Sequence, residues 1–181
     1  MRDKTNLRKQ NIAGFCRWID TARERQGLED RHFIRQLQHC GRGDFPQNEY
    51  LLVSQFQYVH RHFLKKTVHA GEAYGPESIF DAITELHADR IGHGYHLFSP
   101  ELCGPKISSP QDYVGRLARY IADRRITIEV CITSNLQTNP SIGSVENHHF
   151  GHMLKERLSA TLCTDNRLHS NTSVSREIRL A

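Results

Sequence analysis

The sequence contains no hydrophobic run of about 18 residues, the length of a membrane-spanning helix, and therefore indicates no transmembrane segment. It has no CxxC pair, and its 5 cysteines are an odd number, which argues against a disulfide framework and against a zinc knuckle. No apolar stretch follows Met1, so we expect no secretory signal. Together these absences favour a cytoplasmic protein.

An excess of charge of one sign is also missing. The 181 residues include 24 Lys and Arg against 20 Asp and Glu, and the net charge of +4 is too small to indicate a nucleic acid or a membrane surface as partner. The hydrophobic share of 38% is typical of a globular protein. The length suffices for one domain with a core.

Strand-like apolar runs alternate with helical segments from residue 64 onward. The expected strands are Lys66–His69, Arg90–His93, Ile126–Ile132 and Ser159–Thr164, and the expected helices are Pro76–His87, Pro110–Arg125, His149–Leu158 and Ser173–Ala181. This alternation predicts an α/β fold with a parallel sheet.

The first third of the chain follows a different pattern. Helical spacing predicts helices over Asn6–Gln26, Glu29–Cys40 and Gln47–Leu64, with a turn-rich break at Cys40–Pro46 and no strand before Lys66. We therefore divide the chain into a mostly helical region, 1–63, and an α/β region, 64–181.

Three of the expected strands end in side chains that can bind a metal or transfer a proton. His69 ends the first and is followed by Glu72, His93 stands between two glycines, and Asp165 follows the last apolar run. Functional side chains of parallel sheets gather at the carboxyl ends of the strands. Each residue taken alone also has a structural interpretation. His69 could be a core histidine, Glu72 an acid at the start of a helix, and His93 a residue of a turn. Asp165 is the strongest single candidate, since a carboxylate at the end of a buried strand is costly unless paired or bound to metal.

Four segments in this order resemble the adenosine deaminase family of zinc-dependent TIM-barrel hydrolases, over about Phe63 to Ala181. They are Thr67–Glu72 (TVHAGE), Ile91–Tyr95 (IGHGY), Glu129–Leu136 (EVCITSNL) and Thr164–Asn166 (TDN). The resemblance implies that residues 64–181 form the C-terminal half of a (β/α)8 barrel. The other zinc deaminases, which carry a PCxxC motif, are a separate family, and that motif is absent.

The resemblance also implies a role for each candidate residue. His69 and Asp165 correspond to Zn²⁺ ligands, Glu72 to the acid that protonates the purine ring, and His93 to the residue that orients or deprotonates the attacking water. Asp165 would also contact that water. Asn166 stands where many relatives have a second Asp that contacts purine N7, and its amide could donate to that atom.

Two zinc ligands of the family are not matched. Relatives carry a His-x-His motif on their first strand, whereas the one His-x-His here, His60–His62, lies in an expected helix, where residues two apart do not share a face. We interpret it, together with His148, His149 and His152, as surface. We also do not transfer the family's glycine contact to the base onto Gly41–Asp44.

The resemblance predicts zinc-dependent hydrolytic deamination of adenosine or a related aminopurine nucleoside, giving an inosine-type product and ammonia. Two alternatives stay open: a non-catalytic remnant with a binding or assembly role, and a relative that acts on another aminopurine. The expected partner is a small purine nucleoside, and a half barrel with open sheet edges would favour self-association.

Overall fold

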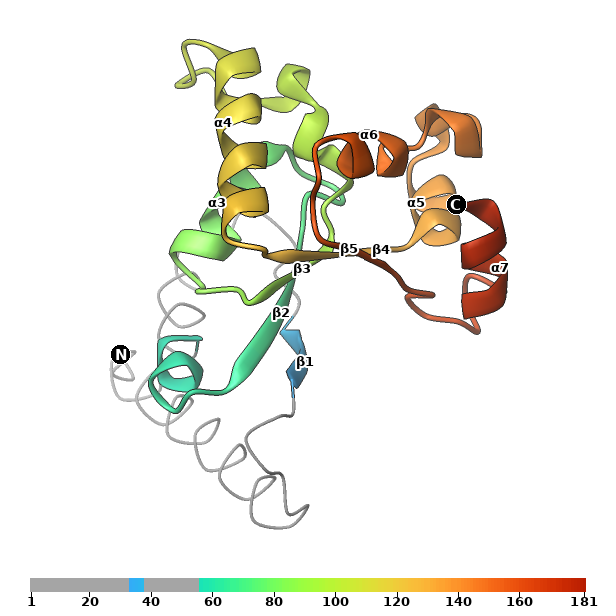
Figure 1. The fold of residues 1–181 in the computed structure, drawn as a ribbon, viewed down its shortest axis with the longest axis horizontal. Helices are drawn as coiled ribbons and strands as arrows, with labels where there is room; N and C mark the ends of the chain where they lie inside the picture. Colours follow the sequence, from blue (N-terminus) through green and yellow to red (C-terminus); the bar gives the residue numbers. More distant parts are fainter. Residues whose placement is uncertain (1–32, 38–55) are drawn as a thin grey trace, which may run out of the picture.

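The fold is an open parallel sheet flanked by helices, and the computed structural model describes it for residues 33–37 and 56–181 (Figure 1). The sheet has 5 strands in the order β1-β2-β3-β4-β5, and each neighbouring pair is parallel. The strands are β1 (Phe33–Leu37), β2 (Lys65–Ala70), β3 (Arg90–His93), β4 (Thr127–Val130) and β5 (Ala160–Leu162). Chain order equals spatial order, which is the arrangement of a (β/α) barrel.

Helices connect these strands and cover the sheet. They are α3 (Pro76–Thr84), α4 (Pro110–Asp123), α5 (Ile132–Thr138), α6 (Phe150–Lys155) and α7 (Val174–Leu180). Short 3₁₀ helices lie between them: η1 (Tyr95–Phe98), η2 (Pro100–Leu102), η3 (Pro140–Ile142) and η4 (Val145–Asn147). In Figure 1, α3 and α4 lie beside each other at one end of the sheet, and α5 and α7 lie together at the other.

Proline and apolar spacing explain the two longest helices. Pro76 and Pro110 occupy the first turns of α3 and α4, where the missing N–H costs no hydrogen bond. The buried face of α4 consists of Val114, Leu117, Ala118 and Ile121. Leu117, Ala118 and Ile121 of this face pack into one apolar core with four strand residues, Val68, Ile91, Ile128 and Val130. The core fixes the strands whose carboxyl ends bear the candidate residues.

The α/β half-barrel expected from the sequence is confirmed, and so are the four strands and four helices predicted after residue 64, with small differences at their ends. Two local predictions are wrong. Residues 33–37 form strand β1 where a helix was expected, because pairing with β2 fixes this segment. Helix α5, which contains Thr133–Asn135, was not expected, and it begins at Ile132, the last residue of the expected strand Ile126–Ile132.

Most of the first third cannot be compared with its prediction. The expected helix Asn6–Gln26 and the break Cys40–Pro46 lie outside the described residues. Of the expected helix Gln47–Leu64, residues 56–61 are helical. The division of the chain at residue 63 stays a prediction.

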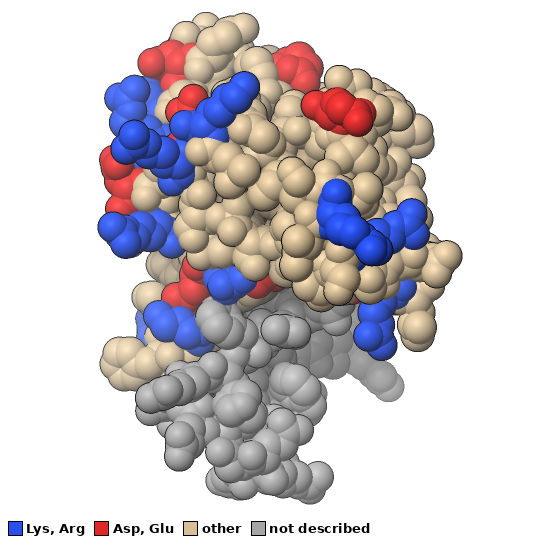
Figure 2. All heavy atoms as spheres, turned by 45° about the vertical axis from the view of Figure 1, so that its right-hand side comes forward, with Lys and Arg blue, Asp and Glu red and all other residues tan. Residues whose placement is uncertain are grey.

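The surface carries charges of both signs. On the face shown in Figure 2, Lys and Arg lie in separate groups near the rim, and a broad surface without charged residues lies between them. None of the described helices is long and apolar enough to cross a membrane. No disulfide joins the described cysteines Cys103, Cys131 and Cys163.

Candidate active site at the carboxyl ends of the strands

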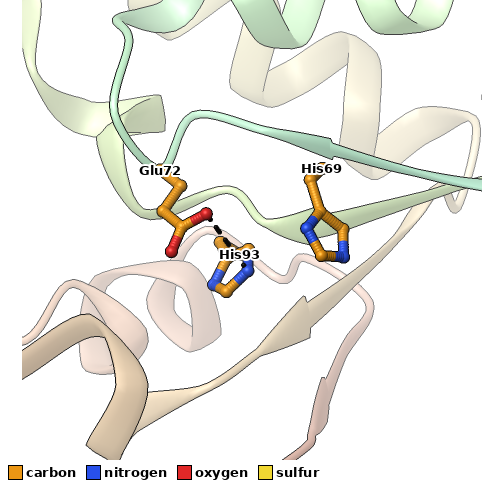
Figure 3. A group of neighbouring side chains, drawn as sticks. All are labelled: His69, Glu72 and His93. Atoms are coloured by element: carbon orange, nitrogen blue, oxygen red, sulfur yellow. Dashed lines mark ion pairs between the residues drawn. The ribbon is translucent and has the colours of Figure 1, made fainter. Parts of the chain in front are cut away.

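His69 lies near the end of β2, and its ring extends over the neighbouring strand β3 (Figure 3). Gly92 is its partner in the strand register. A Cβ atom at Gly92 would lie 2.5 Å from Cδ2 of His69, so any side chain there would displace the ring. Gly92 therefore makes room for the imidazole.

His93 is the last residue of β3, and its side chain is only 2% exposed. Its φ of 65° lies in the left-handed region, which few non-glycine residues adopt, and Gly94 follows with a φ of 58°. This turn aims the ring at His69, whose edge it meets with the centroids 4.9 Å apart and the planes at 86°.

Glu72 lies in the loop between β2 and α3, and that loop is tied down on both sides. The Gly71 N–H donates to Ser78 Oγ at 2.9 Å, and the His96 N–H donates to the Gly71 carbonyl at 2.7 Å. The Glu72 carboxylate is thereby directed at His93, with 3.4 Å between Oε2 and Nε2 (Figure 3). His69, Glu72 and His93 each offer one atom that could bind a metal ion, and these three atoms lie within 4.8 Å of one another.

Asp165 follows β5 and faces the same space from another element. Its φ of 53° is also left-handed, and its Oδ2 accepts a hydrogen bond from Ser134 Oγ at 2.9 Å. The side chain is exposed, so the argument that an unpaired carboxylate would be costly at the end of a buried strand does not apply to Asp165. The β5 run is only partly buried, and Asp165 lies beyond its end.

A hollow of about 620 Å³ joins these elements. His69, His93, Asp165 and Asn166 line it, together with Glu129, whose carboxylate accepts from Arg90 Nε at 2.5 Å. The side-chain oxygen of Asn166 accepts from the His169 N–H at 3.0 Å, which leaves its amide nitrogen as the group able to donate to a ligand. A hollow of this volume matches small-molecule sites.

Burial sets the protonation of the three clustered groups. It raises the pKa of the Glu72 carboxyl above its usual value, an effect that His69 opposes and Asp165 reinforces. It lowers the pKa of His69, with His93 adding to the shift, and it also lowers the pKa of His93. The arrangement therefore favours neutral imidazoles beside an acid that keeps its proton to higher pH.

Imidazole nitrogens combined with carboxylate oxygens suit a divalent metal such as Zn²⁺. Two ligand sets are open. The family resemblance selects His69 and Asp165, whereas the donors that lie together within 4.8 Å are those of His69, Glu72 and His93. His69 belongs to both sets. Zinc sites use three or four protein ligands, so the resemblance-based pair fits part of such a site.

The other histidines divide between surface and interior. His60 and His62 are exposed, as expected. The ring of His60 stacks on that of His87, and the ring of His62 contacts that of Tyr58. The expectation that His148 is surface is wrong, because it is only 6% exposed. His148 instead bonds to Asn135, through Nε2 and Oδ1 at 3.2 Å.

Sequence reasoning assigned no contacts in the site to residues of α5. Ser134 contacts Asp165, and Asn135, which is 1% exposed, contacts His93 Nδ1 through its Nδ2 atom at 3.2 Å. The signal was available in part, since these two residues lie in a segment that carried the family resemblance. Their partners depend on tertiary contacts, which spacing alone does not give.

A family model described as "Adenosine deaminase" matches residues 42–181 of the chain. The adenosine deaminase of Mycobacterium marinum is 38% identical over 134 residues, covering 74% of this chain and 35% of that protein. The adenosine deaminase of Mycobacterium bovis is 40% identical over 126 residues, covering 68% of this chain and 33% of its own length. The chain thus spans about a third of the length of these curated relatives.

Solved structures of similar fold include an N6-mAMP deaminase from Arabidopsis. It is 28% identical, has a TM-score of 0.52, and aligns with 71% of this chain and 33% of its own. Two others are similar in fold alone. An adenine deaminase from Arthrobacter aurescens has a TM-score of 0.66 at 15% identity, covering 93% of this chain and 45% of that one. A COG1816 amidohydrolase from Burkholderia ambifaria with bound Zn has a TM-score of 0.63 at 23% identity, covering 96% and 43%.

Proposed function

Because the chain belongs to the adenosine deaminase family, we propose that its chemistry is the zinc-dependent hydrolytic deamination of adenosine or a related aminopurine nucleoside. The observation that carries the proposal is the convergence of His69, Glu72 and His93 within 4.8 Å, beside the hollow that Asp165 lines. The products would be an inosine-type nucleoside and ammonia.

Glu72 supplies the proton in this proposal. Its raised pKa, caused mainly by burial, keeps a share of the carboxyl protonated nearer to neutral pH than an exposed glutamate. Transfer of that proton to a purine ring nitrogen would offset the negative charge that develops as water adds to the carbon bearing the amine. A lowered pKa would reduce the protonated share of the carboxyl at neutral pH.

His69 and Asp165 are the proposed metal ligands. Zinc held there would activate water by lowering its pKa toward about 7. Burial keeps the His69 imidazole neutral, the form that binds a metal. Ser134 holds the Asp165 carboxylate in place through its hydroxyl.

His93 orients water and Asn166 binds the purine. The His93 ring is held rigidly by burial, so it can direct a hydrogen bond at an oxygen atom in the hollow. The free amide nitrogen of Asn166 would donate to purine N7, which is an acceptor. A nucleotide is the second candidate substrate, because the N6-mAMP deaminase structure is among those similar to this chain.

The test is turnover by the purified chain with zinc, measured as ammonia release from adenosine, AMP and N6-methyl-AMP. We expect release from at least one substrate, and Glu72→Gln should abolish it while leaving zinc binding intact, since an amide cannot donate the required proton. Full activity of that variant would remove Glu72 from the mechanism.

Turnover at saturating zinc separates catalysis from the alternative of a non-catalytic remnant. Because only two ligands are matched by family resemblance, we expect the chain to lose most of its zinc to a mild chelator. Absence of turnover with every substrate at saturating zinc would favour a binding or assembly role. Cytoplasmic location and self-association stay predictions from the sequence.

A further inference from the structure

A chain of hydrogen bonds runs through the interior from a backbone amide to His93. The Phe150 N–H donates to His148 Nδ1 at 3.0 Å, His148 Nε2 lies 3.2 Å from Asn135 Oδ1, and Asn135 Nδ2 lies 3.2 Å from His93 Nδ1. The three side chains are 6%, 1% and 2% exposed, so no solvent competes for these contacts.

The Phe150 amide determines which ring nitrogen of the neutral His148 carries the hydrogen. A backbone N–H can only donate, so His148 Nδ1 must present its lone pair. A neutral imidazole has one such nitrogen, and Nε2 therefore carries the hydrogen. The neutral form is favoured because burial, together with the neighbouring His149, lowers the pKa of His148 to about 4.

The same logic extends to the next two groups. Because His148 Nε2 is a donor, it must face the oxygen of Asn135, and the Asn135 amide must then turn its NH₂ group to His93. The reverse orientation would set two donors against each other. His93 Nδ1 accordingly accepts, and the hydrogen of the neutral His93 ring resides on Nε2, the nitrogen 3.4 Å from Glu72.

We propose that Asn135 and His148 are positioning residues that hold His93 in the tautomer with its hydrogen on Nε2, pointing into the site. In this form His93 donates a hydrogen bond toward Glu72 or a bound oxygen and has no lone pair on that side. His93 therefore orients water and does not deprotonate it, and it is not a metal ligand. The claim that His93 orients water rests on the proposed function, whereas the claim about its tautomer does not.

The first measurement is the tautomer of each histidine in the wild-type chain, from ¹⁵N ring chemical shifts in two-bond ¹H–¹⁵N NMR spectra. At mildly alkaline pH, where ordinary imidazoles are neutral, we expect both His93 and His148 to show a protonated Nε2 and an unprotonated Nδ1. A protonated Nδ1 at either residue would overturn the proposal. This readout needs neither substrate nor turnover.

The second measurement uses Asn135→Asp, which replaces the donor facing His93 by an acceptor. We expect the His93 hydrogen to move to Nδ1, with the His148 pattern unchanged. His148→Leu tests the same relay should Asn135→Asp not fold: without His148 the Asn135 amide is free to turn, so His93 should populate both tautomers. An unchanged His93 pattern in a folded variant of either kind would contradict the relay.

Asn139→Asp is the matched control. Asn139 directly follows helix α5, the helix that contains Asn135. Its Nδ2 lies 3.5 Å from Nε2 of another histidine, His96, and the substitution adds the same negative charge. The His93 tautomer should not change in this variant. If the chain turns over substrate, Asn135→Asp should lower kcat by roughly 10²-fold with little change in KM, the scale of a misdirected acid–base group. A changed His93 tautomer with an unchanged kcat would contradict the proposed role of His93 in catalysis, but not the effect of Asn135 on the tautomer.

Discussion

At the residue scale, the site depends on small residues as much as on its functional groups. His69 can lie over β3 only because residue 92 has no side chain. The sequence marked four candidates because they lie at the ends of expected strands or shortly after them, and the structure brings them to one edge of the sheet: His69, Glu72, His93 and Asp165. The roles assigned to them stay predictions.

Gly92→Ala should weaken metal binding without unfolding the protein. The new Cβ would lie 2.5 Å from Cδ2 of His69, so the ring must move away from its present direction. We expect the zinc dissociation constant, measured by calorimetric titration, to rise roughly tenfold or more, as with lost support of a metal ligand.

Gly115→Ala serves as the control for that substitution. Gly115 lies within α4, and a Cβ there would meet no atom within 4 Å. Alanine also favours a helix over glycine by about 1 kcal/mol. Zinc affinity should therefore stay at the wild-type value, and an equal loss in both variants would refute a specific role for Gly92.

At the element scale, α5 is the helix near the site that sequence reasoning did not predict. Its residues Ile132–Thr138 are β-branched or polar for the most part, and such residues have weak helix propensity. A residue of α7, the fully buried Glu177, stabilises the helix instead. Its carboxylate accepts hydrogen bonds from the backbone N–H and the hydroxyl of Thr133. It also accepts one from the hydroxyl of Thr172. A contact 44 residues away leaves no local pattern.

Glu177→Gln should destabilise the protein by about 1–3 kcal/mol, the cost of a buried donor without a partner. The amide has one oxygen, so it cannot serve both the Thr133 N–H and the two hydroxyls. Urea unfolding measures the difference. The exposed Glu156→Gln is the control, expected within about 0.5 kcal/mol of wild type; equal stability of both variants would show that Glu177 does not anchor α5.

At the scale of the whole molecule, the α/β pattern after residue 64 was predictable because helical and strand periodicities are strong there and the connections are regular. Strand β1 was not, since pairing with β2 fixes it and its own spacing resembles a helix. The burial of His148 was missed for a similar reason: its partner Asn135 belongs to helix α5, whereas His148 lies in the connection between η4 and α6.

The buried His148 makes stability depend on pH. Burial and His149 hold its pKa at about 4 in the folded chain, against 6.5 for an ordinary histidine. Between these values the unfolded chain binds a proton that the folded chain does not, so stability falls as the pH decreases from about 6.5 to about 4. The expected loss from this residue is about 3 kcal/mol.

Urea unfolding at a series of pH values tests this dependence. His148→Gln removes the titrating group, so its free energy of unfolding should change less across the same interval, even if it is lower throughout. The other histidines with lowered pKa values, His69 and His93, remain in that variant and account for a residual slope. Parallel curves for the two proteins would exclude His148 as the source.

His93 and Asp165 share one further property, their left-handed backbone. Such conformations cost of order 1–3 kcal/mol when neighbouring structure imposes them on residues other than glycine. Two of the candidate residues are thus held in positions that their own segments would not adopt in isolation. The surrounding fold offsets that cost, so the geometry of the site depends on the stability of the scaffold around it.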